Sequence, residues 1–512
     1  MRNIFKPAEE EPLPDLEVVD PNDLTSAAPP TKTKWQRLWP VFACGAGLYS
    51  DGYLNGVIGT VNTLLSKIYP VDYKGTTAGK NVASIAFAGT VFGQLLFGWV
   101  ADNYSRKFAM TASALLLILF ATLCTASYGA GGSPEGLFTM LTVCRFFLGI
   151  GIGGEYPAGS VAAAEATGEI QKGTRNRWFI FFTNLMIDLG FVVSAFVPLV
   201  FLWILGDDLH ALRANWRISL GFGIIPPFLL FFLRARLHEP EQTKKNTMKR
   251  VKTPYSLVIK YYWKRLLVVS AIWFIYDFSV YSAGIYSSSI LTFVIPDQSL
   301  YKSFGWNVVL NLFYIPGAFS GAFMSDYFGP KWTLVIGLVL QAILGYIMAG
   351  CYASLATPQY VAAFTVVYGL FLTFGEMGPG DNIGLVASKT CATAVRGQYY
   401  GIAAAIGKIG AFVGTYVFPT IIKSAGGENT TRGNQAPFWV SSSLCVFSAL
   451  LALFFVPSIG QDTIVREDRL FKEYLEKQGW DVSQLGSGDE GSGGSGVVVV
   501  DERDGEKDRA KI

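Results

Sequence analysis

The amino-acid sequence predicts an all-α membrane protein with twelve transmembrane helices in two six-helix halves. Of its 512 residues, 51% are hydrophobic and only 15% are charged, whereas soluble globular proteins contain about 25% charged residues. Apolar runs of about twenty residues recur along the chain, and a helix of that length crosses the hydrocarbon core of a bilayer. A charged motif after the second run is repeated after the eighth. This repeat predicts that the chain is built from two related halves.

The apolar runs set the boundaries of the predicted elements. The expected spans lie near 38–60, 82–101, 108–128, 137–164, 178–205, 216–234, 266–292, 306–325, 332–351, 359–387, 399–423 and 436–457. An acidic, Pro-rich stretch at 1–34 lacks periodicity and is predicted to be a disordered cytosolic tail. The two halves then occupy 35–234 and 264–457, with a polar cytosolic loop at 235–263 between them. The tail at 458–512 is polar and partly Gly/Ser-rich, so it is predicted to be cytosolic and largely disordered.

The distribution of basic residues predicts the orientation in the membrane. Most of the lysines and arginines outside the spans fall in alternate loops, at 106–107, 175–177, 234–252, 331 and 389–396. The positive-inside rule places these loops, and therefore both termini, in the cytosol. The glycosylation sequon at Asn429 then lies on the outer side, where it is available for modification.

Composition also excludes several classes of function. The net charge of +3 is nearly neutral and no basic block predicts nucleic-acid binding. The only histidines, His210 and His238, fall in predicted loops, and the six cysteines form no CxxC pair. Neither a metal site, a disulfide framework nor a bound cofactor is therefore expected. No nucleophile–base pair is evident, so an enzyme is not predicted.

The predicted helix near 137–164 contains an acidic residue where a membrane span is normally apolar. Glu155 falls about 15 Å along the helix from Arg145, near the middle of the bilayer. A carboxylate there is costly unless it faces a cavity or a partner, so Glu155 marks a candidate transport pathway. Gly149 and Gly153 share a face, where a neighbouring backbone can approach closely. The alternative is a small-residue packing helix with one buried ion pair.

Other predicted spans carry polar side chains at helical spacing. These sets are Asp51 with Asn55 in the first span, Asn184 with Asp188 in the fifth, and Trp273, Asp277 and Tyr281 in the seventh. Residues three or four apart lie on one helix face, so each set projects in one direction. An aromatic stripe alone is typical of packing, but an aspartate inside it favours a functional site.

The tenth and eleventh spans add a helix break and a lysine. Gly378, Pro379 and Gly380 interrupt helical hydrogen bonding, as in broken helices that line cavities, and Glu376 lies beside them. Lys408 is surrounded by small apolar residues in the eleventh span. A buried ammonium group needs a carboxylate neighbour or an anionic substrate. Lys408 therefore favours an anionic substrate, although a neighbouring carboxylate would also satisfy it.

The repeated charged motif carries a family resemblance. G-W-V-A-D-N-Y-S-R-K-F follows the second span from Gly98, and S-D-Y-F-G-P-K-W follows the eighth from Ser325. These stretches resemble the G-x-x-x-D-x-x-x-R-K signature of the major facilitator superfamily, and the resemblance covers about residues 38–457. It implies a gate in which Asp102 and Arg106 pair with a neighbouring helix end and hold one conformer. The expected gating residues are Asp102, Arg106, Lys107, Arg145, Asp326 and Lys331.

Further motifs narrow the resemblance. G-I-G-G-E-Y-P, W-x-x-x-D-x-x-x-Y and the G-K pair of the eleventh span resemble phosphate:proton symporters. G-P-G-D-N-I-G, V-R-G-Q-Y-Y-G-I-A-A-A-I-G-K and S-D-G-Y-x-N-G-V-I-G resemble the fungal glycerophosphoinositol permeases, which carry glycerophosphodiesters. By matching position, the resemblance implies phosphate contacts from Tyr156, Trp273, Asp277, Tyr281 and Lys408, and proton handling by Asp51 and Glu155.

Two departures from the phosphate carriers point to a larger substrate. Glu155 replaces an aspartate, and Gly380 replaces the asparagine that would contact inorganic phosphate. The missing side chain makes room, and Asp381 or Asn382 is then a candidate to hydrogen-bond a polyol. The glutamine of the fifth helix in these carriers has no clear counterpart, and Asn184 and Asp188 are the nearby candidates.

The resemblance and the departures together imply proton-coupled uptake of glycerophosphodiesters, such as glycerophosphoinositol, by alternating access across the plasma membrane. The expected partners are a small anionic phosphodiester, protons and the lipid bilayer, and we expect a monomer. An inorganic phosphate:proton symporter is the main alternative. A carrier for another organic anion or polyol, or a nutrient sensor of transporter fold, is a weaker one.

Overall fold

The computed structural model describes residues 33–74, 76–235, 253–295, 299–427 and 430–485, together with Met248. Within these ranges the regular elements are all helical. The first half contains α1 (Lys34–Gly45), α2 (Tyr49–Ile68), α3 (Thr77–Asn103), α4 (Arg106–Thr125), α5 (Pro134–Glu155), α6 (Val161–Ala166), α7 (Arg175–Phe182), α8 (Asn184–Leu205), α9 (Leu209–Phe222) and α10 (Ile225–Ala235). The second half contains α12 (Tyr255–Val294), α13 (Leu300–Leu312), α14 (Tyr314–Tyr327), α15 (Pro330–Gly350), α16 (Tyr352–Leu355), α17 (Val361–Gly375), α18 (Asp381–Lys389), α19 (Arg396–Ser424) and α20 (Thr431–Phe455). A further helix, α21 (Thr463–Lys477), follows it.

Eleven helices or helix chains among the described residues are long and apolar enough to cross a membrane. They correspond to the second through twelfth predicted spans. The first predicted span lies in α1 and α2, which a short 3-10 turn (η1, Ala46–Leu48) separates. This stretch is helical over 34–68 and therefore continues beyond the predicted end at residue 60. The arrangement agrees with twelve membrane-crossing segments.

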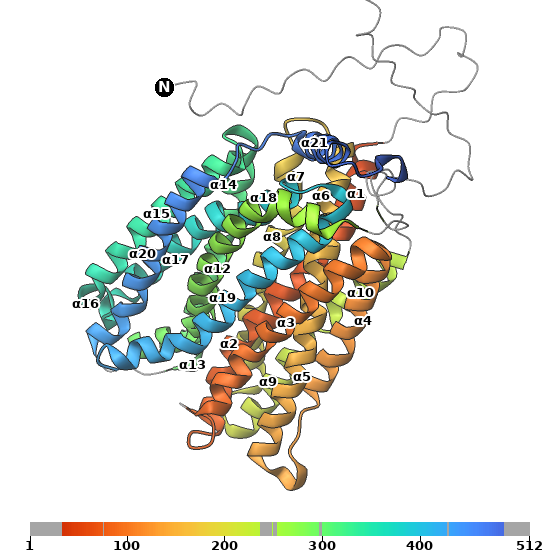
Figure 1. Cartoon of the computed structure of the whole chain (residues 1–512). Helices are drawn as coiled ribbons and strands as arrows, with labels where there is room; N and C mark the ends of the chain where they lie inside the picture. Colours follow the sequence, from red (N-terminus) through yellow and green to blue (C-terminus); the bar gives the residue numbers. More distant parts are fainter. Residues whose placement is uncertain are drawn as a thin grey trace, which may run out of the picture.

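The long helices run side by side and form two groups that meet along the middle of the molecule (Figure 1). Helices α2, α3 and α8 of the first half pack against α12, α13 and α19 of the second. Helix α1 begins, and α21 lies, at the same end of the bundle, which we call the terminal face (Figure 1). The interface between the halves therefore runs from the terminal face to the opposite end.

Small residues bring the helices of the first half into close contact. A Cβ atom added at Gly149 of α5 would lie 2.0 Å from the Ala86 carbonyl oxygen of α3, and one at Gly153 would lie 2.3 Å from that of Thr90. No side chain fits at such distances, so glycine is required for this backbone approach. The prediction from the glycine spacing is confirmed.

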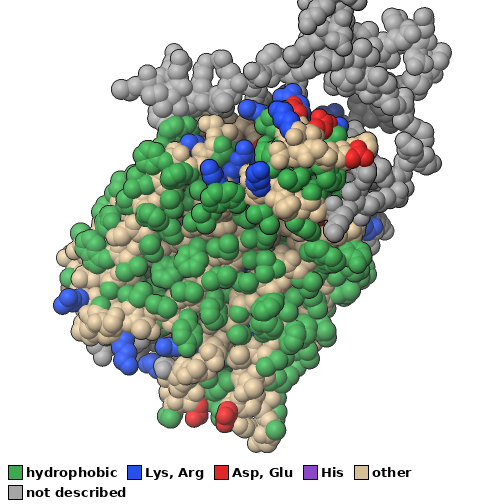
Figure 2. All heavy atoms as spheres, viewed as in Figure 1, with side chains coloured by type: hydrophobic (Ala, Val, Ile, Leu, Met, Phe, Trp, Pro, Cys, Tyr) green, Lys and Arg blue, Asp and Glu red, His purple; other side chains and the backbone are tan. Residues whose placement is uncertain are grey.

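The surface is that of a membrane protein. Large apolar side chains such as Phe92, Leu119 and Phe454 are exposed on the wall of the bundle, whereas Asp51, Arg145 and Lys408 are buried. Figure 2 shows hydrophobic side chains over the wall, with charged ones gathered toward the two ends. This distribution is the one that a bilayer selects, because lipid solvates apolar groups and leaves charges to the interior and the ends.

Two boundaries differ from those predicted. Helix α12 begins at Tyr255, inside the predicted loop at 235–263, because its first turns pack on α21 through Tyr262, Phe471 and Leu475. Helix α21 itself lies in the predicted disordered tail. It is amphipathic, and it buries Ile464, Phe471 and Leu475 on one face. The mean hydropathy of this segment is low, so its apolar face was not recognised in the sequence. The predictions for 1–32, Asn429 and 486–512 concern residues outside the described ones.

Candidate functional site

A lysine and two aspartates meet between the halves. The Lys408 ammonium of α19 lies 3.6 Å from Oδ2 of Asp51 on α2 and 3.4 Å from Oδ2 of Asp277 on α12. The three residues are at most 2% exposed. One cation thus faces two carboxylates, one from each half. The sequence analysis allowed either a neighbouring carboxylate or an anionic substrate as the partner of Lys408. The structure provides two neighbouring carboxylates.

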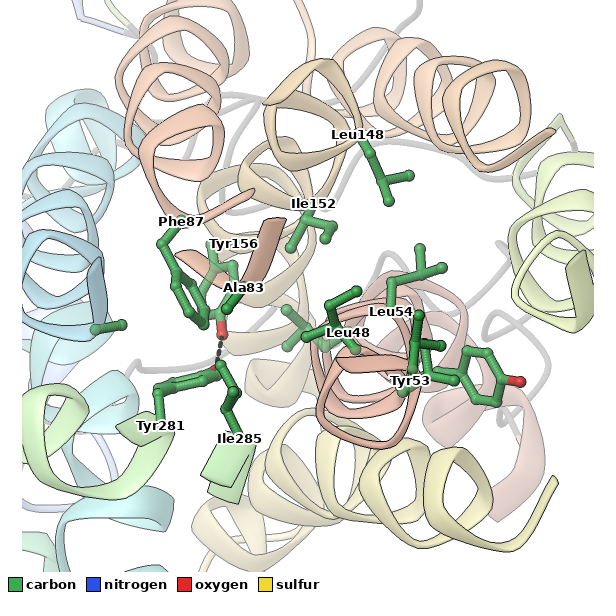
Figure 3. Packing of buried hydrophobic residues seen from close by; sticks show 14 of the residues in the cluster. Leu48, Tyr53, Leu54, Ala83, Phe87, Leu148, Ile152, Tyr156, Tyr281 and Ile285 are labelled. Atoms are coloured by element: carbon green, nitrogen blue, oxygen red, sulfur yellow. Dashed lines mark hydrogen bonds between the residues drawn. The ribbon is translucent and has the colours of Figure 1, made fainter. Parts of the chain in front are cut away.

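Tyrosine hydroxyls complete this cluster. Tyr156 and Tyr281 both donate to Oδ2 of Asp51, the latter at 3.0 Å, and Lys408 donates to the Tyr281 hydroxyl. The two hydroxyl oxygens lie 3.5 Å apart and point toward one another from opposite halves (Figure 3). Asn55 donates to Oδ1 of Asp51 at 2.5 Å. Asp51 is therefore surrounded by donors.

The local backbone explains how the cluster forms. Tyr156 opens a single π-helical turn (η3, Tyr156–Ser160) that contains Pro157, and such turns redirect side chains within a long helix. On α12, Asp277 and Tyr281 are one turn apart and reach Lys408 from the same face. The Trp273 ring lies one turn earlier and packs at 90° against Tyr400 of α19. The predicted stripe of Trp273, Asp277 and Tyr281 thus faces the second half's α19.

A cavity adjoins the cluster at the interface between the halves. Its walls include Leu48, Tyr156, Asn184, Ile187, Phe191, Trp273, Tyr276, Asp277, Val280, Tyr281, Glu376, Gly380, Ile383, Gly384 and Tyr400. Asp277 and Tyr281 link the cavity to Lys408. Five of the predicted substrate-binding residues, Tyr156, Asn184, Trp273, Asp277 and Tyr281, therefore line one space.

The opposite wall of the cavity is acidic. Glu376 opens a second π-helical turn (η6, Glu376–Gly380), and Tyr276 donates to its Oε2 at 3.0 Å. Asn184 donates to the Gly380 carbonyl. Asp188 and Asp381 interact electrostatically with Glu376, and neither has a hydrogen-bond partner. The structure thus brings Asp188 to Glu376 and not to Lys408.

Asp381 and Asn382 do not line the cavity. Asp381 lies against Gly321 of α14, where an added Cβ would be 2.0 Å from its Oδ2. Asn382 accepts from Ser325 at 2.5 Å and donates to the carbonyls of Met377 and Gly378. Both side chains are fully buried. In this conformation Asn382 holds α14 against the broken helix, which differs from the predicted contact with a polyol.

Glu155 lies in a separate buried pair. Its carboxylate accepts from both terminal nitrogens of Arg234 on α10, at 2.6 and 2.8 Å, and from Ser113 of α4 at 2.8 Å. Arg234 also donates to the carbonyls of Ala43, Cys44 and Met110. The geometry matches the alternative of a packing helix with one buried ion pair. The sequence did not identify Arg234 as the partner, although it ends an apolar run.

The first charged motif joins the two halves at the terminal face. Asp102 accepts from the backbone N–H groups of Gly397 and Gln398, at 2.9 and 2.7 Å, at the start of α19. Arg106 pairs with Asp102 at 3.2 Å and with Glu165 at 2.8 Å, and Glu165 also pairs with Arg396 at 3.0 Å. The carboxylate lies at a helix N-terminus, where the macrodipole favours it. The expected contact with a neighbouring helix end is present.

The second motif makes a smaller set of contacts across the halves. Asp326 pairs with Arg177 at 3.0 Å and accepts from the Asn176 N–H at 3.2 Å. Gln461, just before α21, donates to Asp326 at 3.1 Å. The two motif lysines, Lys107 and Lys331, are partly exposed near the starts of α4 and α15.

Arg145 makes its described contacts within the first half. Its guanidinium donates to the carbonyls of Val82 at 2.8 Å and of Leu54 at 3.5 Å. These bonds join α5 to α3 and α2. In this conformation Arg145 therefore acts inside one half, whereas a gating residue must make contacts that break between halves.

Comparisons with known proteins place these residues in context. The family described as "Sugar (and other) transporter" matches residues 40–242 and 235–471. A glycerophosphocholine permease of Candida albicans is 55% identical over 93% of this chain and 87% of its own length. The major glycerophosphoinositol permease of the same organism is 53% identical, over 90% of this chain and 85% of its own. A probable inorganic phosphate transporter of Arabidopsis thaliana is 26% identical, over 78% and 88%.

The solved structures that resemble this one share its fold. The proton:xylose symporter XylE, in complex with a bromo-deoxyglucose, superposes with a TM-score of 0.68. The match covers 85% of this chain and 98% of the symporter, at 18% identity. At this identity the likeness concerns the helical architecture alone.

Proposed function

Because the chain belongs to the sugar and other transporter family of the major facilitator superfamily, we propose that it imports glycerophosphodiesters together with protons. Relatives that are 52–55% identical are permeases for glycerophosphocholine, glycerophosphoinositol or glycerophosphodiesters. The inorganic phosphate transporters are more distant, at 25–26% identity. The protein is thus a multi-pass transporter and not an enzyme.

The observation that carries the proposal is the Lys408 cluster between the halves. When both carboxylates are ionised, Asp51, Asp277 and Lys408 sum to one negative charge. A phosphodiester anion would add a second negative charge to a buried site, which is costly. Protonation of one aspartate removes this excess and frees Lys408 to pair with the phosphate. Substrate and proton therefore bind best together.

Hydrogen bonding favours Asp277 as the acid that exchanges the proton. Asp51 accepts from Asn55, Tyr156 and Tyr281. These donors stabilise its ionised form, because each bond is stronger to a charged acceptor. Asp277 pairs with the Lys408 ammonium, interacts electrostatically with Asp51 and Glu376, and lines the cavity. Protonation of Asp277 therefore breaks fewer interactions than protonation of Asp51. Glu155, which is held by Arg234, is assigned to packing.

Transport requires the halves to move around this midplane site. The contacts of Asp102 and Asp326 close the terminal face and must break before substrate can leave on that side. We place the terminal face in the cytosol, since Arg106, Arg175 and Lys389 lie there. Both termini are then cytosolic in the plasma membrane. One copy contains the complete pathway, so a monomer suffices.

A glycine in the cavity wall supports an organic phosphodiester over inorganic phosphate. A Cβ atom at Gly380 would lie 2.3 Å from Oε2 of Glu376, so any other residue would displace that carboxylate. Inorganic phosphate, as a dianion, would be repelled by Glu376 in the same wall. A phosphodiester carries a single charge and an additional group that can extend toward Glu376.

Uptake assays in cells that lack other glycerophosphodiester carriers test the proposal. Labelled glycerophosphocholine and glycerophosphoinositol are supplied at external pH 5 and pH 7, with and without excess inorganic phosphate. We expect uptake of at least one phosphodiester, faster at pH 5 and little affected by phosphate. Uptake of phosphate in preference to both diesters would establish the alternative, an inorganic phosphate symporter.

A further inference from the structure

A group of buried carboxylates at the cavity takes no part in the binding of phosphate and proton proposed for the Lys408 cluster. Glu376 lines the cavity, and Asp188 and Asp381 interact electrostatically with Glu376. Among the described residues, no ion pair joins any of these three carboxylates to a lysine or arginine. Burying ionised carboxylates without a cation is costly, so a positive group that enters the cavity would stabilise them.

One of these carboxylates lines the cavity, and a second lies on a helix that contributes to its wall. Glu376 is part of its wall. Asn184, Ile187 and Phe191 of α8 also line it, and Asp188 lies on the same face of that helix between them. Asp188 is 1% exposed, and neither of its carboxylate oxygens has a hydrogen-bond partner. An unpartnered buried carboxylate beside an open space is the group that a bound cation would satisfy.

Aromatic rings also line this cavity. Tyr276, Trp273 and Phe191 contribute to its walls, and the Tyr276 hydroxyl donates to Glu376 at 3.0 Å. Faces of aromatic rings attract cations, and they suit quaternary ammonium groups because these have no N–H to donate. The wall therefore combines negative charge with ring faces, the two features that recognise a trimethylammonium group.

Two faces of α12 point to the acidic side and to the phosphate side. Asp277 faces Lys408, whereas its neighbour Tyr276 faces Glu376. Glu376 and Asp277 are close enough to interact electrostatically. The cavity thus has two charged ends: Lys408 lies behind Asp277 and Tyr281, and Glu376 lines the wall beside Tyr276. A substrate with a phosphate and a quaternary ammonium a few bonds apart matches both ends, whereas an inositol head group offers no positive charge.

We propose that Glu376 and Asp188 form a subsite for the cationic head group of the substrate, and that this chain prefers glycerophosphocholine to glycerophosphoinositol. This inference rests on the proposed function, namely phosphodiester uptake through the Lys408 cluster. The names of the relatives do not decide between the two head groups, because permeases for each are similarly close. The arrangement of charged groups around this cavity favours the choline head group over the inositol head group.

The test compares the two substrates in the same cells. Labelled glycerophosphocholine and glycerophosphoinositol uptake is measured for the unaltered protein, Glu376→Gln and Asp188→Asn, each normalised to protein at the cell surface. We expect each variant to lower glycerophosphocholine uptake at least about fivefold, since a cation contact of 1–2 kcal/mol is lost. Glycerophosphoinositol uptake should stay within about twofold. Glu135→Gln, at an exposed acid on α5, is the matched control and should change neither.

The outcomes separate this inference from the function on which it rests. If the unaltered protein carries neither diester, the proposed function fails. If it carries both but the variants lower both equally, or change the pH dependence of both, the carboxylates serve proton coupling or folding and the subsite is wrong. Competition in the unaltered protein tests the preference without any variant. Unlabelled glycerophosphoinositol that displaces labelled glycerophosphocholine more effectively than glycerophosphocholine itself would overturn it.

Discussion

Glu155 and Glu376 occupy corresponding places in the two halves but have opposite surroundings. Each lies at a one-turn π-helical break in the fourth helix of its half, followed by a proline within four residues. Each also abuts a glycine, Gly47 or Gly380, whose missing side chain leaves space for the carboxylate. Glu155 is neutralised by Arg234, whereas Glu376 accepts hydrogen bonds from Tyr276 and Asn184, pairs with no cation among the described residues and faces the cavity.

The difference shows how one local pattern serves two purposes. In the first half the break is closed by an ion pair that joins α5 to α10, α4 and α1. In the second half the break leaves a carboxylate at the cavity that pairs with no lysine or arginine of the described part of the chain. The ion pair in the first half therefore stabilises the fold, whereas the carboxylate in the second half is available to bind a cationic group. Four experiments test this division, from the largest expected effect to the smallest.

Arg234→Ala should destabilise the protein most. It leaves Glu155 buried without its cation, and breaking a fully buried pair costs about 3–5 kcal/mol. Thermal unfolding of the purified protein in detergent measures the loss. Arg213→Ala, at an exposed arginine on α9, serves as the control and should shift the midpoint little. An unchanged unfolding midpoint for Arg234→Ala would contradict the proposed difference between the two halves, because the stability of the protein would then not depend on the Glu155–Arg234 pair.

Lys408→Ala should abolish uptake while the protein still reaches the membrane. Asp51 and Asp277 can take up protons when the lysine is lost, so the fold survives, but the phosphate has no cation to pair with. Removing a charge-assisted contact of about 3 kcal/mol lowers uptake by roughly a hundredfold. Uptake at fixed surface level is the measurement. Normal uptake would show that the cation between the halves is structural, like Arg234.

Ser113→Ala and Tyr276→Phe form a matched pair. Each removes one hydrogen bond to a buried glutamate, worth about 1–3 kcal/mol when the acceptor is charged. We expect Ser113→Ala to lower the unfolding midpoint with uptake unchanged. Tyr276→Phe should lower glycerophosphocholine uptake severalfold and change the midpoint less than Ser113→Ala, because Asn184 still hydrogen-bonds Glu376. If both variants affect the same property, the two breaks do not differ in purpose.

Glu376→Gln should change stability least, by about 0.5 kcal/mol or less in either direction. It removes a buried charge that has no cation, so the lost tyrosine contact is offset by the lower cost of burial. Glu155→Gln should instead destabilise, since Arg234 is then left unpaired. Thermal unfolding of the two variants side by side measures the contrast, and equal losses would contradict it.

Sequence patterns predicted much of the site but not its pairings. Asp51, Asp277, Tyr281 and Lys408 were selected as polar residues in apolar spans, and Tyr156 by the family resemblance. The structure gathers all five. Partners that lie in other spans could not be found this way. Arg234 is 79 residues from Glu155, and Tyr276 is 100 residues from Glu376. Tyr276 also gave no signal, because an aromatic residue in a membrane span is usually packing.

The sequence by itself determined that this is a multi-span transporter with buried charges in particular helices. Hydropathy and helical spacing are local properties, and a charge inside an apolar span needs a reason wherever the span lies. Only the tertiary structure decided which charge meets which. Lys408 meets Asp51 and Asp277, Glu155 meets Arg234, and Glu376 meets no cation among the described residues. Coulomb energies depend on the distance between charges and on burial, and both are set by how the helices pack.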